Sequence, residues 1–166
     1  MGTKIAEVMS DRPRAVTPQT SVREAAQLME QEDVGALPVV DDGTRLVGIL
    51  TDRDIAVRVV GQGADPERTQ VGDVASKDVV ALTPEHDLDD ALKLMAQEQV
   101  RRLPIIAEEN ELVGVIAQAD LARMAKDKTA GQVVEAISEP PRGPRVAGQE
   151  GSSDVRVADS EQRSDY

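Results

Sequence analysis

The chain has 166 residues, carries a formal net charge of −12 and contains no cysteine, tryptophan or phenylalanine. This length suits one ordinary domain or two very small ones. The missing cysteines exclude a disulfide framework, a thiolate metal site and a cysteine nucleophile. The negative charge and the near absence of aromatic rings argue against nucleic acid as a partner.

The N-terminal segment, MGTKIAEVMSD, has no long apolar run, so we expect no signal peptide. No stretch of about 18 apolar residues occurs along the chain, and we therefore expect no membrane-spanning helix and no membrane partner. The lack of cysteine is compatible with a cytoplasmic location.

An internal repeat organises the sequence. Residues 8–58 align without a gap on residues 74–124 at an offset of 66, with 18 identities in 51 positions. Average residue usage would give about one identity in fifteen by chance. The chain therefore holds two copies of one unit, joined at residues 61–70 by a linker that contains two glycines and a proline.

Each copy begins with a short apolar stretch that ends at Thr-Pro, at residues 15–16 and 79–82. Proline cannot continue a strand ladder, so a loop follows. The apolar spacing of the next segment predicts a helix. Ser21 and Glu24 have the spacing of a capping box at its start, and the second copy has acidic residues in both places.

Two strands joined by a turn follow this helix. The first copy reads LPVV, DDGT and RLVGIL, and the second reads LPII, EENE and ELVGVI. We interpret DDGT as a hairpin turn rather than a calcium loop, because the remaining ligands of such a loop are missing. A second helix is predicted from Thr51 to about Val60, and from Gln118 to about Lys126. The order of each unit is therefore β-α-β-β-α, which gives an α+β fold.

The C-terminal part has a different composition. We expect a short helix at residues 128–138, followed by a disordered tail at residues 139–166, where proline, glycine, serine and charge occur without apolar periodicity. A unit of about 50 residues buries too little surface to fold alone. The two copies are therefore expected to pack around a shared core with pseudo-twofold symmetry.

The pattern resembles a tandem pair of cystathionine-β-synthase (CBS) domains, also called a Bateman module. The resemblance covers residues 5 to about 127. It rests on Thr-Pro, Ala-x-x-Leu-Met, Leu-Pro, Leu-Val-Gly and Thr-x-x-Asp motifs in the same order in both copies, with alanine replacing the last threonine in the second. The chain is similar in particular to stand-alone bacterial pairs such as actinobacterial hypoxic response proteins. This resemblance implies CBS repeats at residues 5–60 and 71–127, a homodimer of modules, and adenine nucleotides bound between the repeats.

The resemblance also implies two unlike ligand sites. In the family, the aspartate of the Ser/Thr-x-x-Asp motif accepts hydrogen bonds from ribose hydroxyls, and adjacent arginines suit a phosphate. Site one would combine Ile49, Thr51, Asp54, Val79, Val80, Val100, Arg101 and Arg102. Site two, which lacks the hydroxyl group and is expected to be weaker, would combine Pro13, Arg14, Gly35, Ala36, Ile116 and Asp120.

Several of these residues also have a purely structural interpretation. Thr51 and Asp54 have the spacing of a helix capping box. Arg101 and Arg102 can instead pair with nearby acids at the surface or in a dimer interface. Arg53 either reaches a phosphate or remains at the surface. His86, the only histidine, is expected to lie exposed in a loop.

The sequence thus predicts a regulatory protein that binds AMP, ADP, ATP or S-adenosylmethionine and acts through its dimer or through an unidentified effector protein. The alternative is a ligand-free protein associated with stress or hypoxia. An enzyme is disfavoured, because the sequence shows no nucleophile–base pair, no metal cluster and no partner for its one histidine. We expect no required cofactor and no metal site.

Overall fold

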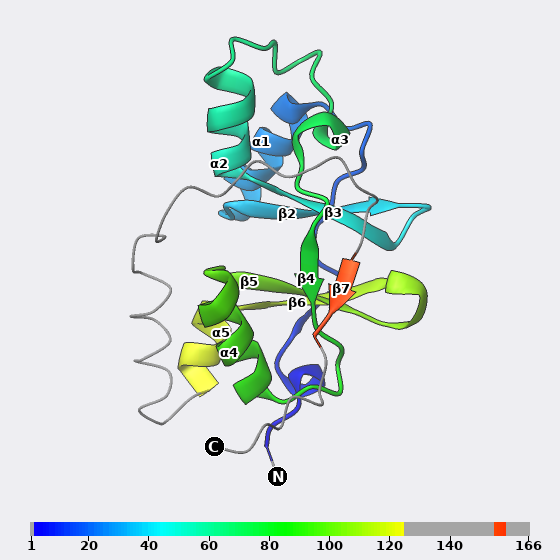
Figure 1. Cartoon of the computed structure of the whole chain (residues 1–166), viewed down its shortest axis with the longest axis vertical. Helices are drawn as coiled ribbons and strands as arrows, with labels where there is room; N and C mark the ends of the chain where they lie inside the picture. The colour runs from blue at the N-terminus through cyan, green and yellow to red at the C-terminus, as the bar shows by residue number, and fades with distance from the viewer. Residues whose placement is uncertain (1, 125–154, 159–166) are drawn as a thin grey trace.

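Two β-hairpins form the frame of the molecule, one in each repeat (Figure 1). The structure is a computed structural model that describes residues 2–124 and 155–158. Both hairpins are antiparallel, and they consist of β2 (Ala36–Asp41) with β3 (Arg45–Thr51), and β5 (Arg102–Ile106) with β6 (Leu112–Ala117).

The offset of 66 residues is also visible in the geometry of the hairpins. The first hairpin has a register shift between Val39 and Val40, and the second has one between Ile105 and Ile106. Val39 and Val40 correspond to Ile105 and Ile106 at the offset of 66 residues. The two tandem units of the predicted α+β fold are therefore confirmed down to an irregularity in their strands.

The first helix of each unit packs beside its hairpin. These helices are α1 (Val22–Glu32) and α4 (Leu88–Glu98). Ser21 accepts a hydrogen bond from the amide of Glu24 at 3.1 Å, and the Glu24 carboxylate accepts one from the amide of Ser21 at 3.1 Å. Both predicted capping boxes are present, with Asp87 at the start of α4. Local spacing was sufficient to locate these two helix starts.

The second helix of each unit follows the hairpin directly. In the first unit, α2 (Asp52–Asp54) continues as a π-helix, η2 (Ile55–Val60), and in the second unit α5 spans Gln118–Met124. Both helices begin at the end of a strand, as predicted. No helix within residues 2–124 and 155–158 is long and apolar enough to cross a membrane.

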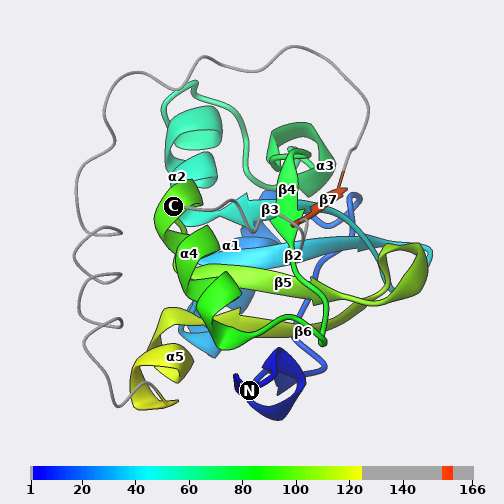
Figure 2. The same ribbon diagram turned by 60° about the horizontal axis from the view of Figure 1, so that its bottom comes forward.

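The two repeats exchange their first elements. The short helix η1 (Ile5–Glu7) lies against the second repeat, where Ile5 is fully buried and its amide donates to the carbonyl of His86 at 2.9 Å. The helix α3 (Val71–Val74) lies against the first repeat, where the Val71 amide donates to the carbonyl of Thr20 at 2.9 Å. Figure 2 shows the N-terminal segment beside β6, with which β1 (Ser10–Asp11) pairs. Each unit of the sequence is therefore completed by a segment that precedes the other unit.

One apolar cluster contains residues from both repeats and joins them. Leu46 of β3, Ile106 of β5 and two residues of β4 (Val79–Ala81) form its buried part. A further strand, β7 (Val155–Val157), pairs in parallel with β4. The structure therefore differs from the expected disorder at Val155–Val157, where two β-branched valines favour a strand. The helix predicted at residues 128–138 lies outside the described residues.

Candidate binding site between the two repeats

Thr51 ends β3 and caps α2 through a reciprocal pair of hydrogen bonds. The Thr51 amide donates to Asp54 Oδ2 at 2.9 Å, and the Asp54 amide donates to Thr51 Oγ1 at 3.1 Å. The capping-box interpretation of these residues is therefore confirmed. This capping box uses only one of the two carboxylate oxygens of Asp54. The other, Oδ1, lies 4.0 Å from the Arg58 guanidinium, and the Asp54 side chain is 15% exposed.

The same corner in the second repeat lacks one of these bonds. The Ala117 amide donates to Asp120 Oδ2 at 3.1 Å, but alanine has no hydroxyl group to return the bond. Oδ1 of Asp120 lies 3.9 Å from the Arg123 guanidinium, and the Asp120 side chain is 28% exposed. Both aspartates thus hold a helix start with Oδ2, while Oδ1 lies near an arginine of the same helical segment.

Arg101 and Arg102 differ from most arginines in this acidic chain. Arg101 is exposed, and its carbonyl accepts from the Gln118 amide at 2.8 Å, while Arg102 pairs with Ala117 across the hairpin. Neither guanidinium forms an ion pair with any described residue. In the same part of the chain, seven arginines do pair with acids, and Arg12 and Arg53 are the others that do not. The paired arginines are Arg14, Arg23, Arg45, Arg58, Arg68, Arg123 and Arg156. The surface salt bridge that we considered for Arg101 and Arg102 is not formed within the described residues.

The apolar residues of predicted site one belong to two clusters, one shared by both repeats and one in the second repeat. Ile49 exchanges two backbone hydrogen bonds of 2.9 Å with Ser76, which leads into β4. Ile49 packs against the same cluster as Val79, which is 3% exposed. Val80 is partly buried and, like Val100, packs against the core of the second repeat. The structure therefore brings Ile49 and Val79 together at the junction of the repeats, while Val80 and Val100 pack against the second repeat.

The polar part of site one is not joined by direct contacts. No hydrogen bond or ion pair between described residues links Thr51 or Asp54 to Arg101 or Arg102. Within the hairpins, Thr51 of site one pairs with Ala36 of site two, and Arg102 of site one pairs with Ala117 of the second repeat. The grouping of the threonine and the aspartate with the two arginines remains a prediction.

Site two contains a residue that the structure places elsewhere. Ile116 is 0% exposed and belongs to the core of the second repeat. By the offset, its counterpart is the fully buried Leu50, and the counterpart of Ile49 is the partly buried Val115. Successive strand residues point to opposite faces, so a shift of one position moves the side chain from the partly buried face of the hairpin to the buried one. The alignment of the repeats therefore indicates Val115, rather than Ile116, as the counterpart of Ile49 in the predicted site two.

Several of the other residues of site two already have contacts within the fold. Arg14 already pairs with Glu32 at 3.2 Å, and Pro13 is partly buried. A side chain at Gly35 would meet Asp52 Oδ2 at 2.9 Å, and Ala36 lies within β2. Site two therefore offers Oδ1 of Asp120 to a ligand. Unlike site one, it contains no assigned arginine that lacks an ion pair.

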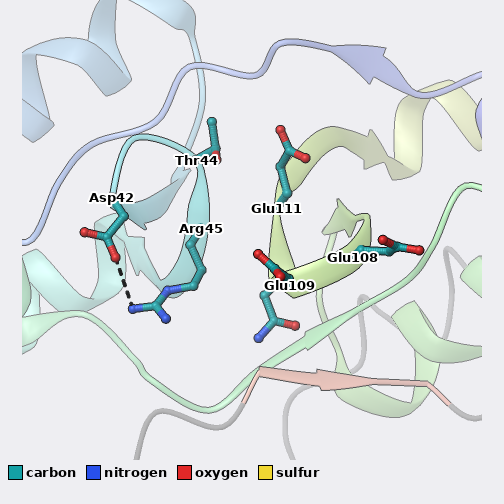
Figure 3. A pocket seen from close by; sticks show the side chains of 7 residues that line it. Asp42, Thr44, Arg45, Glu108, Glu109 and Glu111 are labelled. Atoms are coloured by element: carbon teal, nitrogen blue, oxygen red, sulfur yellow. Dashed lines mark ion pairs between the residues drawn. The ribbon is translucent and has the colours of Figure 1, made fainter.

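A cavity of about 610 Å³ lies between the turns of the two hairpins (Figure 3). It is at the opposite end of β3 from Thr51, and Arg45 in its wall pairs with Asp42 at 3.5 Å. Its lining is mostly acidic and consists of Asp42, Thr44, Arg45, Glu108, Glu109, Asn110 and Glu111. No three His, Cys, Asp or Glu side chains in the described part of the chain are placed to hold a metal ion.

His86 is not in the exposed loop environment that we expected. It is partly buried, and its Nδ1 accepts from the amide of Thr83 at 3.1 Å. Its Nε2 lies 3.1 Å from the carbonyl oxygen of Ala158. The expectation failed because the partner of this side chain is 72 residues away in the sequence.

Comparisons with known proteins agree with the fold. The family model of the CBS domain matches residues 5–61 and 71–127. The CBS domain-containing protein YhcV of Bacillus subtilis is 44% identical over 137 residues, which cover 82% of this chain and 96% of the relative. The crystal structure of Hypoxic Response Protein I with two coordinated zinc ions has a TM-score of 0.69 and 35% identity, covering 74% of this chain and 99% of the other. The structure of CBSX2 in complex with AMP has a TM-score of 0.66 and 26% identity, covering 74% and 96%.

Proposed function

The chain belongs to the family of CBS-domain proteins, and on this premise we propose that it is a regulatory module that binds an adenosine-type ligand between its repeats. AMP, ADP, ATP and S-adenosylmethionine are the candidates. The observation that carries the proposal is the unpaired state of Arg101 and Arg102 among the described residues of a chain whose net charge is −12. Two cations without an acidic partner favour an anionic ligand.

The chemistry of the first repeat complements these arginines. Oδ1 of Asp54 has two lone pairs that can accept from the adjacent hydroxyls of a ribose, while Oδ2 stays bound to the amide of Thr51. Ile49 and Val79 offer apolar surface for a base. The AMP bound to CBSX2, at 26% identity, supports this ligand class.

A ligand between the repeats would act on a second surface. Val57, Val60 and Met124 are 53%, 71% and 51% exposed, and all three lie on the second helices of the two units. Exposed apolar side chains on these helices favour contact with a second copy of the chain, so we propose a homodimer. The output would be a change in this dimer or in the binding of an effector protein, without catalysis.

The test is a thermal titration of the purified protein with AMP, ATP and S-adenosylmethionine. A ligand at 100 times its Kd stabilises the folded state by about 2.7 kcal/mol. The decisive pair of variants is Asp54→Asn and Asp120→Asn. In both variants the side-chain amide oxygen can still accept the hydrogen bond at the helix start, while an NH2 donor replaces the acceptor Oδ1.

We expect Asp54→Asn to weaken binding by about tenfold or more, as for a lost hydrogen bond to a charged group. Asp120→Asn should have a much smaller effect. Equal losses in both variants would contradict the assignment of the ligand to site one. The absence of any shift in Tm at millimolar ligand would favour the alternative, a ligand-free protein associated with stress or hypoxia.

A further inference from the structure

Residues at both ends of β4 form backbone hydrogen bonds with the two hairpins, but the middle of β4 pairs with a single strand. Upstream, Ser76 is bonded to Ile49, and downstream Leu82 exchanges backbone hydrogen bonds of 3.1 and 2.8 Å with Pro104 and Ile106. Between these points, the strand that pairs with β4 in the described part of the chain is β7. This middle part carries Val79 and Val80, the β4 residues of site one. The position of two predicted ligand contacts thus depends on a strand from the C-terminal part of the chain.

β7 is fastened by three kinds of contact. Val155 packs against the cluster shared by both repeats, and Arg156 pairs with Asp78 at 2.8 Å. The Ala158 amide donates to the carbonyl of Ala81 at 3.1 Å. Val157, by contrast, is 46% exposed. The docking of this strand therefore depends on the inward side chain of Val155 far more than on that of Val157.

His86 adds a directional bond to the end of the strand. Because Nδ1 accepts from the amide of Thr83, the proton of the neutral ring is on Nε2, which then donates to the carbonyl of Ala158. The amide and the carbonyl of Ala158 are thus both bound to the second repeat. Residues 155–158 form a segment with its own set of partners rather than a loose contact.

The ligand and β7 are expected to use opposite edges of β4. The backbone N–H and C=O groups of successive residues in a strand point to opposite edges. The carbonyl of Ala81 points to β7, while the groups of Leu82 point to β5. Those of Val80 therefore point away from β7. A ligand beside Val80 does not need the edge that β7 occupies.

We propose that residues 155–158 are a C-terminal latch that positions β4 and that is coupled favourably to ligand binding between the repeats. The inference rests on the proposed function. The latch orders Val79 and Val80 before the ligand binds. Ligand binding then costs less conformational entropy and is tighter. The coupling is reciprocal, and a ligand must therefore strengthen the docking of the latch by the factor by which the latch strengthens ligand binding.

The first part of the test needs no ligand. Val155→Asp places a charge in the apolar cluster, while the matched control Val157→Asp makes the same change at the exposed position of the same strand. Hydrogen exchange at the Ala158 amide, followed by NMR in the full-length chain, reports docking. We expect faster exchange in Val155→Asp and nearly unchanged exchange in Val157→Asp. Equal exchange in the wild type and Val155→Asp would overturn the latch.

The second part measures the Kd of the best ligand for the same three proteins. We expect Val155→Asp to bind at least about fivefold more weakly than the wild type and Val157→Asp. We also expect ligand to slow exchange at Ala158 in the wild type by the same factor. An unchanged or tighter Kd in Val155→Asp would overturn the coupling while leaving the proposed function intact. No binding by any of the three proteins would overturn the proposed function and the coupling with it. Hydrogen exchange at the Ala158 amide would still report whether the latch docks.

Discussion

At the scale of single residues, the two repeats differ most at the corner between the last strand and the second helix. Thr51 and Asp54 satisfy each other's amides, while Ala117 leaves the amide of Asp120 without a side-chain acceptor. A residue that caps a helix is held in place before any ligand arrives. The corner of the first repeat is therefore both more stable and better prepared to present Asp54 Oδ1.

This difference predicts opposite effects of two matched substitutions. Thr51→Ala removes the acceptor of the Asp54 amide and should lower the free energy of unfolding by about 1 kcal/mol. Ala117→Thr should restore the missing bond in the second repeat and raise the free energy of unfolding. Urea denaturation of both variants measures these changes. A stability unchanged by Thr51→Ala would show that the cap is not formed in solution.

Residues whose partners lie within four positions could be predicted from the sequence. The caps at Ser21 and Thr51 are examples, because the spacing alone defines them. Ile116 and His86 could not be placed in the same way. The first depends on which face of a strand points inward, and the second on a partner far along the chain.

At the scale of elements, the exchange of η1 and α3 ties the repeats together. Ile5 is buried in the core of the second repeat, and Val71 is buried in that of the first. The two residues are equivalent by the offset of 66. Neither core is complete without a segment that precedes the other unit in the chain, which couples the folding of the two repeats.

Truncating the exchanged residues should therefore weaken the repeat on which each packs. Ile5→Ala is expected to cost about 2–5 kcal/mol, as for other buried isoleucines. Native-state hydrogen exchange should show the larger increase in the amides of α4, in the second repeat. Val71→Ala is the matched control and should affect α1 more. A loss of protection in α1 rather than α4 on Ile5→Ala would contradict the exchange.

The contact between the N-terminal segment and α4 also predicts a pH dependence. Lys4 Nζ forms an ion pair with Asp87 Oδ1 at 2.8 Å, and this contact lowers the pKa of the carboxyl below its ordinary value. A lowered pKa in the folded state stabilises the fold above the unfolded pKa of about 3.9, and this stabilisation is lost as the pH falls through the folded pKa. The difference in unfolding free energy between the wild type and Lys4→Met should therefore be largest near neutral pH and shrink in acid. A constant difference in urea titrations at several pH values would contradict this assignment.

The order of elements could be predicted from the sequence, but the exchange could not. Helices and strands follow from periodicity and caps within short windows. The segments at Ile5–Glu7 and Val71–Val74 are too short to show which surface they cover. Their packing partners are determined by the complete fold.

At the scale of the whole molecule, the shared core explains why two small units occur in one chain. The cluster of Leu46, Val79, Ala81 and Ile106 draws on both repeats and also receives Val155. The need for such a junction could be predicted, because a unit of about 50 residues buries too little surface alone. The contribution of Val155 could not, because three strand residues in a polar segment give no periodic signal.

We propose that the two unlike corners create one effective ligand site in each chain. Isothermal titration calorimetry of the wild type with AMP, ATP and S-adenosylmethionine tests it most directly, because the titration gives the number of ligands bound. The account predicts one ligand per chain for the best of these compounds, with Asp54→Asn removing most of the heat and Asp120→Asn little of it. Two equivalent ligands per chain, or no heat with any of the three at millimolar concentration, would contradict it.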